Sequence, residues 1–354
     1  MNVERTTNKI EFLFRNLVKN DPNLRNAYLL IHSPKSGIDI NIAEGKTNGI
    51  PANPQQPNYM ASVGKLFTSV VICKLYEDKK LSLEDPIKRY LDTELMSGLL
   101  IYKGKDYSNE IKIRHLLNHT SGLFDSFWPL LEKLMKEPKF SITPREAIIW
   151  GKDNCISFGR PGKKMKYTDT NYYLLGLIIE EVTGMTYDEV LLQYIFKPLK
   201  MLNSYVLHVS HPINKCKYSM ASFFVEGIDL SKNQNFKGID YAGGGVVATP
   251  GDLLIFMKAL INGRVLQQKT LQKMMNKPLR FLFVHEYGFG IMRFTRVPLL
   301  EPKSYKIWGH CGATGSFLFY HPVSETYIIG NFNELSYTEK AVKFILMKVV
   351  SRLT

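Results

Sequence analysis

The chain has 354 residues, of which 45% are hydrophobic, 12% aromatic and 22% charged. This composition excludes a disordered or fibrous chain, and it suffices for a buried core without help from disulfides or a metal. The formal net charge of +14 favours anionic partners. However, the basic residues are spread along the chain and form no long basic tail, so we do not expect a nucleic-acid-binding protein.

The cysteines and the first residues bear on metals and location. The four cysteines lie far apart and form no C-x-x-C pair, which predicts neither a zinc site nor a disulfide framework. Residues 1–15 lack the apolar centre of a secretion signal, and no apolar run approaches the ~20 residues of a membrane span. We therefore expect a cytoplasmic protein without a metal or cofactor, although a trimmed leader would leave the same pattern.

The first part of the chain predicts a helix, a hairpin and a second helix. Residues 9–18 carry apolar side chains at helical spacing. Residues 27–32 form a short apolar run, and after a turn residues 38–42 alternate between apolar and polar, as in a half-buried strand. Residues 62–78 are apolar on most faces and predict a buried helix.

The rest of the chain is first mainly helical and then rich in strands. Residues 85–233 show helical periodicity broken by proline and glycine. Thr249 and Pro250 predict a helix start, with threonine as the N-cap and proline at the first helical position. The late strands and the closing helix are expected at residues 306–310, 315–321, 326–331 and 344–353.

Strand signals at both chain ends predict the fold class. We expect an α/β (α+β) protein in which an antiparallel sheet, built from both ends, is flanked by helices and carries an inserted helical domain. The boundaries would be 1–84 and 234–354 for the discontinuous sheet domain and 85–233 for the insertion. The active-site cleft would lie between the two domains.

A Ser-x-x-Lys motif begins the second predicted helix. Because residues i and i+3 share a helix face, the Lys65 amine can reach the Ser62 hydroxyl. The helix N-terminus favours negative charge that develops near Ser62, and a buried lysine with a lowered pKa can act as the base that serine needs. The motif alone is common, and by itself it predicts only a capping serine and a surface lysine.

Two further segments change that interpretation. Residues 167–176 open a helix with Tyr-Thr-Asp, and residues 308–315 read Trp-Gly-His-Cys-Gly-Ala-Thr-Gly. In this order the three segments resemble the penicillin-recognising serine hydrolases, whose motifs are S-x-x-K, Y-x-N and K-T-G or H-x-G. Residues 116–123 and 242–250 extend the resemblance, which covers about residues 25–350. It implies a β-lactamase/transpeptidase-like fold.

The resemblance also implies roles for individual residues. Ser62 would attack the carbonyl carbon, while Lys65 and Tyr167 would move its proton to the leaving group. The backbone N–H groups of Ser62 and Ala313 would form the oxyanion hole. His310 would line the cleft and orient a substrate carboxylate or the Tyr167 hydroxyl. Gly312 would let the backbone approach the substrate.

The sequence departs from the family pattern at two positions. Asp169 stands where asparagine is commoner, and its carboxylate cannot donate to a substrate carbonyl. It would instead hold Lys65 charged, and Asn171 would then replace it as the substrate-binding amide. His310-Cys311-Gly312 replaces K-T-G, which exchanges a permanent cation for a titratable group. The change in the third motif favours an esterase or a D-amino-acid peptidase or carboxypeptidase over an efficient β-lactamase.

Other site types fit the sequence poorly, and two function classes remain open. Gly64-Lys65 lacks the glycine and Ser/Thr of a phosphate-binding loop, and His115 and His119 lack the glutamate of a zinc-binding H-E-x-x-H motif. The first function class is an ester or amide hydrolase acting on a small molecule or short peptide, including one that carries a carboxylate. The second is a catalytically weak binding or sensing protein that uses the same cleft. The oligomeric state stays open.

Overall fold

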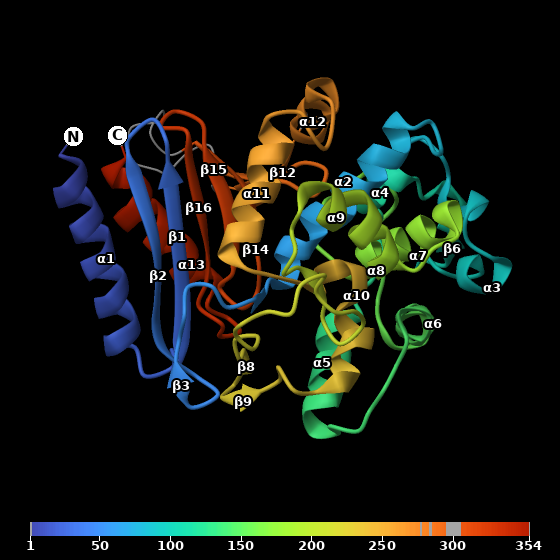
Figure 1. The fold of residues 1–354 in the computed structure, drawn as a ribbon. Helices are drawn as coiled ribbons and strands as arrows, with labels where there is room; N and C mark the ends of the chain where they lie inside the picture. The colour runs from blue at the N-terminus through green and yellow to red at the C-terminus, as the bar shows by residue number, and fades with distance from the viewer. Residues whose placement is uncertain (1, 277, 283–284, 295–305, 354) are drawn as a thin grey trace.

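A central antiparallel sheet organises the chain, whose computed structural model describes residues 2–276, 278–282, 285–294 and 306–353 (Figure 1). The strand order is β11-β12-β13-β14-β15-β16-β1-β2-β3. Strands from both chain ends therefore meet where β16 pairs with β1, with Ile329 opposite Leu30. The strands are β1 (Asn26–Ser33), β2 (Ile38–Thr47), β3 (Ile50–Pro51), β11 (Leu279–Leu282), β12 (His285–Tyr287), β13 (Met292–Phe294), β14 (Ile307–Cys311), β15 (Phe317–His321) and β16 (Thr326–Asn331).

Helices cover both faces of this sheet. Successive side chains of a strand point to opposite faces, so in β1 Leu29 and Ile31 join one core while Leu30 joins the other. The first core contains α1 (Val3–Asn20) and α13 (Thr338–Phe344). The second contains α2 (Gly64–Glu77) and α11 (Pro250–Ile261), which contacts β16 and β1.

Except for α12 (Gln268–Met275), which lies beside α11, the remaining helices form the side of the molecule away from the termini (Figure 1). They pack around α2 and α7, whose buried side chains belong to the same core. The helices are α3 (Thr93–Met96), α4 (Ile113–Leu117), α5 (Phe127–Lys136), α6 (Pro144–Asn154), α7 (Thr170–Thr183), α8 (Tyr187–Leu191), α9 (Lys197–Leu199), α10 (Lys237–Gly244) and α12 (Gln268–Met275). The short strands are β4 (Asn58–Tyr59), β5 (Ile101–Tyr102), β6 (Lys105–Asp106), β7 (Tyr205–Val206), β8 (Phe224–Val225), β9 (Ile228–Asp229) and β10 (Val246–Ala248).

The predicted fold class is confirmed, with an antiparallel sheet from both chain ends and helices on its faces. The Thr249 side chain accepts the Asp252 N–H at 3.1 Å and caps α11 as predicted. The closing helix begins at Thr338, six residues before its predicted start at residue 344, and includes π-helical and 3-10 turns as far as Arg352. The domain boundaries at 84/85 and 233/234 stay a prediction.

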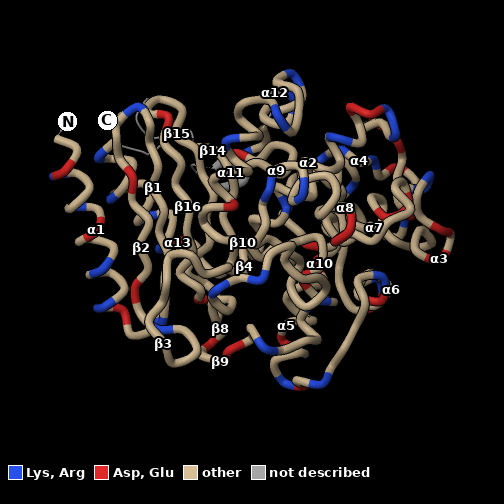
Figure 2. Tube along the Cα trace, viewed as in Figure 1, with Lys and Arg blue, Asp and Glu red and all other residues tan. Residues whose placement is uncertain are grey.

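Charged residues are distributed over many outer segments, whereas the middle of the sheet is largely uncharged (Figure 2). This pattern agrees with the spread of basic residues in the sequence. In the part of the chain that the structure describes, no helix is both long and apolar enough to cross a membrane.

Candidate active site

Ser62 lies in a 3-10 turn (Ala61–Val63) that leads directly into α2. Its side chain does not cap either helical element. Ala61, immediately before it, has a φ of +46°, a left-handed conformation that is uncommon for a residue with a Cβ. Such strained conformations concentrate at functional sites. Here the strained residue immediately precedes Ser62, and both residues line the cavity described below.

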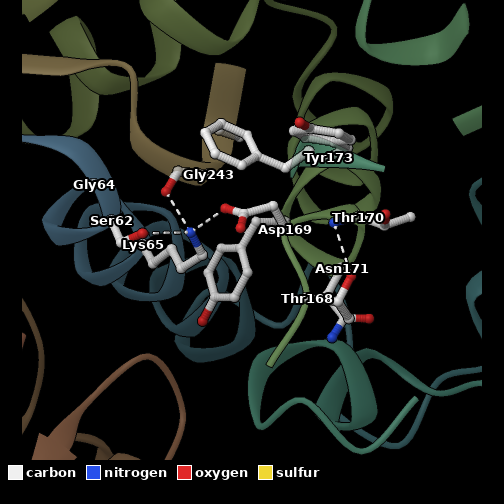
Figure 3. Close-up of polar contacts among 12 residues, drawn as sticks. Ser62, Gly64, Lys65, Thr168, Asp169, Thr170, Asn171, Tyr173 and Gly243 are labelled. Carbon is white, nitrogen blue, oxygen red and sulfur yellow. Dashed lines mark hydrogen bonds and ion pairs between the residues drawn. The ribbon is translucent and has the colours of Figure 1, made fainter. Parts of the chain in front are cut away.

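Lys65 is fully buried on the first turn of α2, and three oxygen atoms surround its amine (Figure 3). The Nζ atom lies 3.0 Å from Ser62 Oγ and 2.8 Å from the carbonyl oxygen of Gly243. It also forms an ion pair with the Asp169 carboxylate. A buried charge needs such partners, because an unpaired one would be expensive to desolvate.

Tyr167 places its ring beside the same amine. The Lys65 Nζ atom lies 5.0 Å from the centre of the Tyr167 ring, and the ring stacks on His119 at 4.2 Å. Burial raises the pKa of the Tyr167 hydroxyl well above its ordinary value, and the Asp169 charge raises it further, while a hydrogen bond with Ser62 opposes both effects. The hydroxyl is therefore protonated near neutral pH and lies in contact with Ser62.

Asp169 and Asn171 have different environments. Asp169 precedes α7 and lines the cavity, where its carboxylate binds Lys65. Asn171 is fully buried, and its amide group accepts from Ser121 Oγ at 2.6 Å and contacts His119 Nδ1 at 3.1 Å. The expected substitution of Asn171 for Asp169 is therefore wrong, because the Asn171 amide is engaged inside the protein and does not belong to the cavity wall.

His310 lies on the far side of its strand from the cavity. Its ring is fully buried, with Nε2 3.0 Å from the Tyr287 hydroxyl and Nδ1 2.7 Å from the Cys311 carbonyl oxygen. Neighbouring residues of a strand face opposite ways, and in β14 it is Cys311 that lines the cavity. This placement corrects the expectation that His310 lines the cleft. Burial and the Lys65 charge lower the pKa of His310 to about 3, so the ring is neutral.

The end of β14 lies against the turn that carries Ser62. A Cβ atom on Gly312 would lie 2.9 Å from both Met60 O and the Ala61 side chain. Glycine is thus needed for the approach of β14 to the Ser62 turn, rather than only for the approach of a substrate. Gly312 N–H donates to Ser316 O at 2.8 Å, which closes a tight turn containing Ala313. Both Gly312 and Ala313 line the cavity.

One cavity of about 810 Å³ joins these residues, a volume typical of small-molecule sites. Ser62, Tyr167 and Asp169 form its polar end together with Ala313. The remaining wall is mostly apolar and comes from α5, α13 and the segments around β8 and α10. Its apolar members include Phe127, Trp128, Leu131, Phe223, Val225, Phe236, Leu335, Val342, Leu346 and Met347.

The described residues contain no group of three or more histidine, cysteine, aspartate or glutamate side chains that could hold a metal ion.

Comparison with known protein families identifies the chain. The family model for Beta-lactamase matches residues 37–349, which is most of the sequence. The chain belongs to the beta-lactamase family. This family assignment confirms the resemblance predicted from the three motifs.

Relatives of this beta-lactamase-family chain include penicillin-binding proteins and hydrolases. It is 28% identical over 236 residues to a putative penicillin-binding protein, PbpX, of Bacillus subtilis strain 168, covering 64% of this chain and 51% of the relative. It is 24% identical over 245 residues to the teichoic acid D-alanine hydrolase of Staphylococcus aureus, covering 68% and 52%. The chain thus spans about half the length of these curated relatives.

Solved structures share the fold over the whole chain. The D-amino acid amidase of Ochrobactrum anthropi SV3, solved with D-phenylalanine, superposes with a TM-score of 0.79 at 23% identity, covering 98% of this chain and 99% of the amidase. At this identity the likeness establishes the beta-lactamase-type fold alone.

Sequence reasoning missed two aspartates of this beta-lactamase-family site. Asp125 accepts the backbone N–H of Asp169 at 3.2 Å, and burial and the Asp169 charge raise its pKa to about 7. Asp240, on α10, lines the cavity itself. Asp125 follows residues 116–123 and Asp240 precedes residues 242–250, the two segments that extended the family resemblance. Their closeness to these segments in the sequence was the signal that could have found them.

Proposed function

We propose that the chain is a serine hydrolase that cleaves an ester or amide bond through a covalent acyl-Ser62 intermediate. The proposal rests mainly on the Lys65 amine, 3.0 Å from Ser62 Oγ, at the polar end of a cavity large enough for a small substrate. Attack by Oγ on the substrate carbonyl carbon needs a base that accepts the hydroxyl proton. Lys65 is the basic side chain in hydrogen-bond contact with this hydroxyl.

The ion pair with Asp169 affects how Lys65 can act as a base. An ammonium group donates to Ser62 Oγ, whereas a base must be a neutral amine. Transfer of the ammonium proton to Asp169 across their hydrogen bond gives a neutral amine without changing the net charge of the pair. The amine then accepts the Ser62 proton as Oγ bonds to the carbonyl carbon.

Tyr167 and two backbone groups complete the proposed chemistry. The protonated Tyr167 hydroxyl, in contact with Ser62, relays a proton to the leaving group as the bond to it breaks. The N–H groups of Ser62 and Ala313 stabilise the oxyanion, and loss of one such donor typically costs ~3 kcal/mol of transition-state stabilisation.

The charges at the site favour some substrates over others. Neutral, inward-facing His310 offers no cation for a substrate carboxylate. The mostly apolar cavity instead suits an acyl group with a large apolar part. We therefore favour esterase or amidase activity over hydrolysis of anionic β-lactams, in line with the amidase and D-alanine hydrolase among the similar proteins.

The proposal is tested by pre-steady-state release of p-nitrophenol from p-nitrophenyl acetate, followed by a panel of D- and L-amino-acid amides and a chromogenic cephalosporin. We expect a rapid burst of one equivalent per chain and then slower steady turnover, because acylation and deacylation are separate steps. A burst without later turnover would favour the weakly catalytic binding protein instead. The absence of both burst and turnover with every substrate would contradict the proposal.

A further inference from the structure

His119 lies beside Tyr167 and outside the active-site cavity, and the proposed chemistry gives it no role. Its side chain is fully buried, and it belongs to residues 116–123, which extended the family resemblance. It follows the end of α4 with a φ of +57°, a left-handed conformation that is uncommon for a residue with a Cβ. Such a conformation persists only where the surrounding contacts hold it in place.

Tyr167 lies in a segment that has no regular secondary structure. Residues 155–169, between α6 and α7, contain no helix or strand. No helix or sheet hydrogen bonds fix this backbone, so the direction of the Tyr167 ring depends on contacts with other parts of the chain. A proton relay requires its hydroxyl to stay within hydrogen-bond reach of the groups that exchange the proton. The proposed chemistry therefore requires a residue that holds Tyr167.

His119 binds the chain on both sides of Tyr167. The Lys166 N–H donates to the His119 carbonyl oxygen at 2.9 Å, and the Thr168 N–H donates to His119 Nδ1 at 3.2 Å. Between these two bonds the Tyr167 ring stacks on the imidazole, with ring centres 4.2 Å apart and 29° between the ring planes. One residue thus contacts both the backbone around Tyr167 and its ring.

The partners of the imidazole determine which of its nitrogens carries the proton. A backbone N–H can only donate, so Nδ1 accepts from Thr168. Asn171 Nδ2 lies 3.1 Å from the same atom, while the Asn171 carbonyl oxygen accepts from Ser121. The proton of the neutral ring is therefore on Nε2. Burial lowers the pKa of His119 well below its ordinary value, and the Lys65 charge lowers it further, so the ring is neutral.

Two more tyrosines hold the imidazole in position. The edge contact with Tyr287 has ring centres 4.8 Å apart, and the Tyr172 ring lies at 5.3 Å. The Tyr172 hydroxyl donates to the Leu117 carbonyl oxygen at 3.2 Å, which ties this ring to the end of α4. In such a close-packed interior the imidazole cannot turn without displacing its neighbours. It therefore presents a fixed surface to Tyr167.

We propose that His119 is a positioning residue that holds the Tyr167 hydroxyl in place for proton transfer to the leaving group. Because it does not line the cavity, it acts through Tyr167 and not on the substrate. The inference rests on the proposed function of Ser62 and Tyr167. Loss of His119 should then matter most for substrates whose leaving group needs a proton, and least for those whose leaving group departs as a stable anion.

Two acetate esters that differ only in the leaving group test this role. p-Nitrophenolate leaves without a proton, whereas the alkoxide of benzyl acetate must be protonated, and both esters give the same acetyl-enzyme. In His119→Asn, asparagine keeps an acceptor for Thr168 and tolerates the left-handed conformation, but it removes the stacked ring. We expect the kcat/KM ratio of p-nitrophenyl to benzyl acetate to rise at least about tenfold, since a displacement of about 1 Å can cost about a hundredfold in rate.

His115→Asn is the matched control. His115 is also buried and accepts a backbone N–H through Nδ1, but the donor is Lys112 at 3.2 Å, at the start of its own helix α4. The ratio should stay within about twofold of the native ratio, because the geometry of Tyr167 is unchanged. An unchanged ratio in His119→Asn would overturn the proposal. That result includes an equal fall with both esters, as expected from a purely structural role.

Tyr167→Phe separates the positioning role from the proton relay itself. Its ratio should rise at least as far as in His119→Asn, and adding His119→Asn to it should change the ratio by less than about twofold, because the relay is already lost. A further rise in the double variant would mean that His119 acts independently of Tyr167, and would overturn the proposal. An unchanged ratio in Tyr167→Phe would contradict the relay in the proposed function, and the positioning role with it.

Nitrogen NMR of the native chain, labelled at its histidines, covers the case in which His119→Asn does not fold or the native chain hydrolyses neither ester. We expect the His119 ring to be neutral near neutral pH, with its proton on Nε2. A proton on Nδ1 would prevent this atom from accepting the Thr168 N–H and would overturn the proposal. Hydrolysis of neither ester, with no acylation of Ser62, would contradict the proposed function separately.

Discussion

Replacing Lys65 with methionine should destabilise the protein as well as inactivate it. The Lys65 side chain is fully buried and Asp169 is only 6% exposed, so the substitution leaves an uncompensated carboxylate in the interior. Removing one partner of a buried ion pair typically costs ~3–5 kcal/mol of folding free energy. Because methionine cannot accept the Ser62 proton, we also expect kcat/KM for p-nitrophenyl acetate to fall by at least about a thousandfold.

The two effects separate in a double variant. Lys65→Met with Asp169→Asn removes the orphaned charge and keeps the shape of the second side chain. We expect the double variant to regain a large part of the lost free energy of unfolding, measured by urea denaturation, because the two residues are directly coupled. Turnover should stay absent. Near-native turnover in Lys65→Met would contradict the role of Lys65 as the base. A loss of stability below about 1 kcal/mol would contradict the buried ion pair.

Ser62→Ala should abolish turnover and leave the fold intact. Removal of a catalytic nucleophile typically lowers kcat by about a millionfold. The Ser62 hydroxyl caps no helix, so the free energy of unfolding should change by less than about 1 kcal/mol. Both quantities are measured on the same preparation, by ester hydrolysis and by urea denaturation.

Ser69→Ala is the control for this substitution. Ser69 lies on the same helix as Lys65, is fully buried, and bonds the Tyr172 hydroxyl at 3.1 Å, but it does not line the cavity. We expect its turnover to stay within a few-fold of the native value. Ester hydrolysis that survived Ser62→Ala, or that was lost equally in Ser69→Ala, would contradict the assignment of Ser62.

Local sequence patterns were enough to predict the main elements and the three motif segments. The alternation of residues 38–42 predicts β2, and the i, i+3 spacing of Ser62 and Lys65 brings their side chains together. These predictions succeed because helix and strand periodicity depend on neighbours in the sequence. Family resemblance then supplied Tyr167 and Asp169, about a hundred residues away, which periodicity alone could not have placed beside Lys65.

Features that depend on tertiary packing were not accessible to the same reasoning. The motif placed His310 at the cleft, but the direction in which a strand residue points depends on which face of the sheet the cavity adjoins. Only its place just before residues 242–250 pointed to Asp240, because its approach to the Ala61 backbone is made across Gly244 by segments far apart in the chain. The left-handed conformation of Ala61 likewise could not be predicted, because alanine rarely adopts it.

The central claim is that Ser62 becomes acylated, and the most direct test is mass spectrometry after reaction with a fluorophosphonate, which forms a stable adduct with activated serines. We predict a single added mass on the intact protein, located on Ser62 in the peptide that contains it, and no adduct on Ser62→Ala. An unmodified chain, or an adduct on another residue with Ser62 left free, would contradict the account.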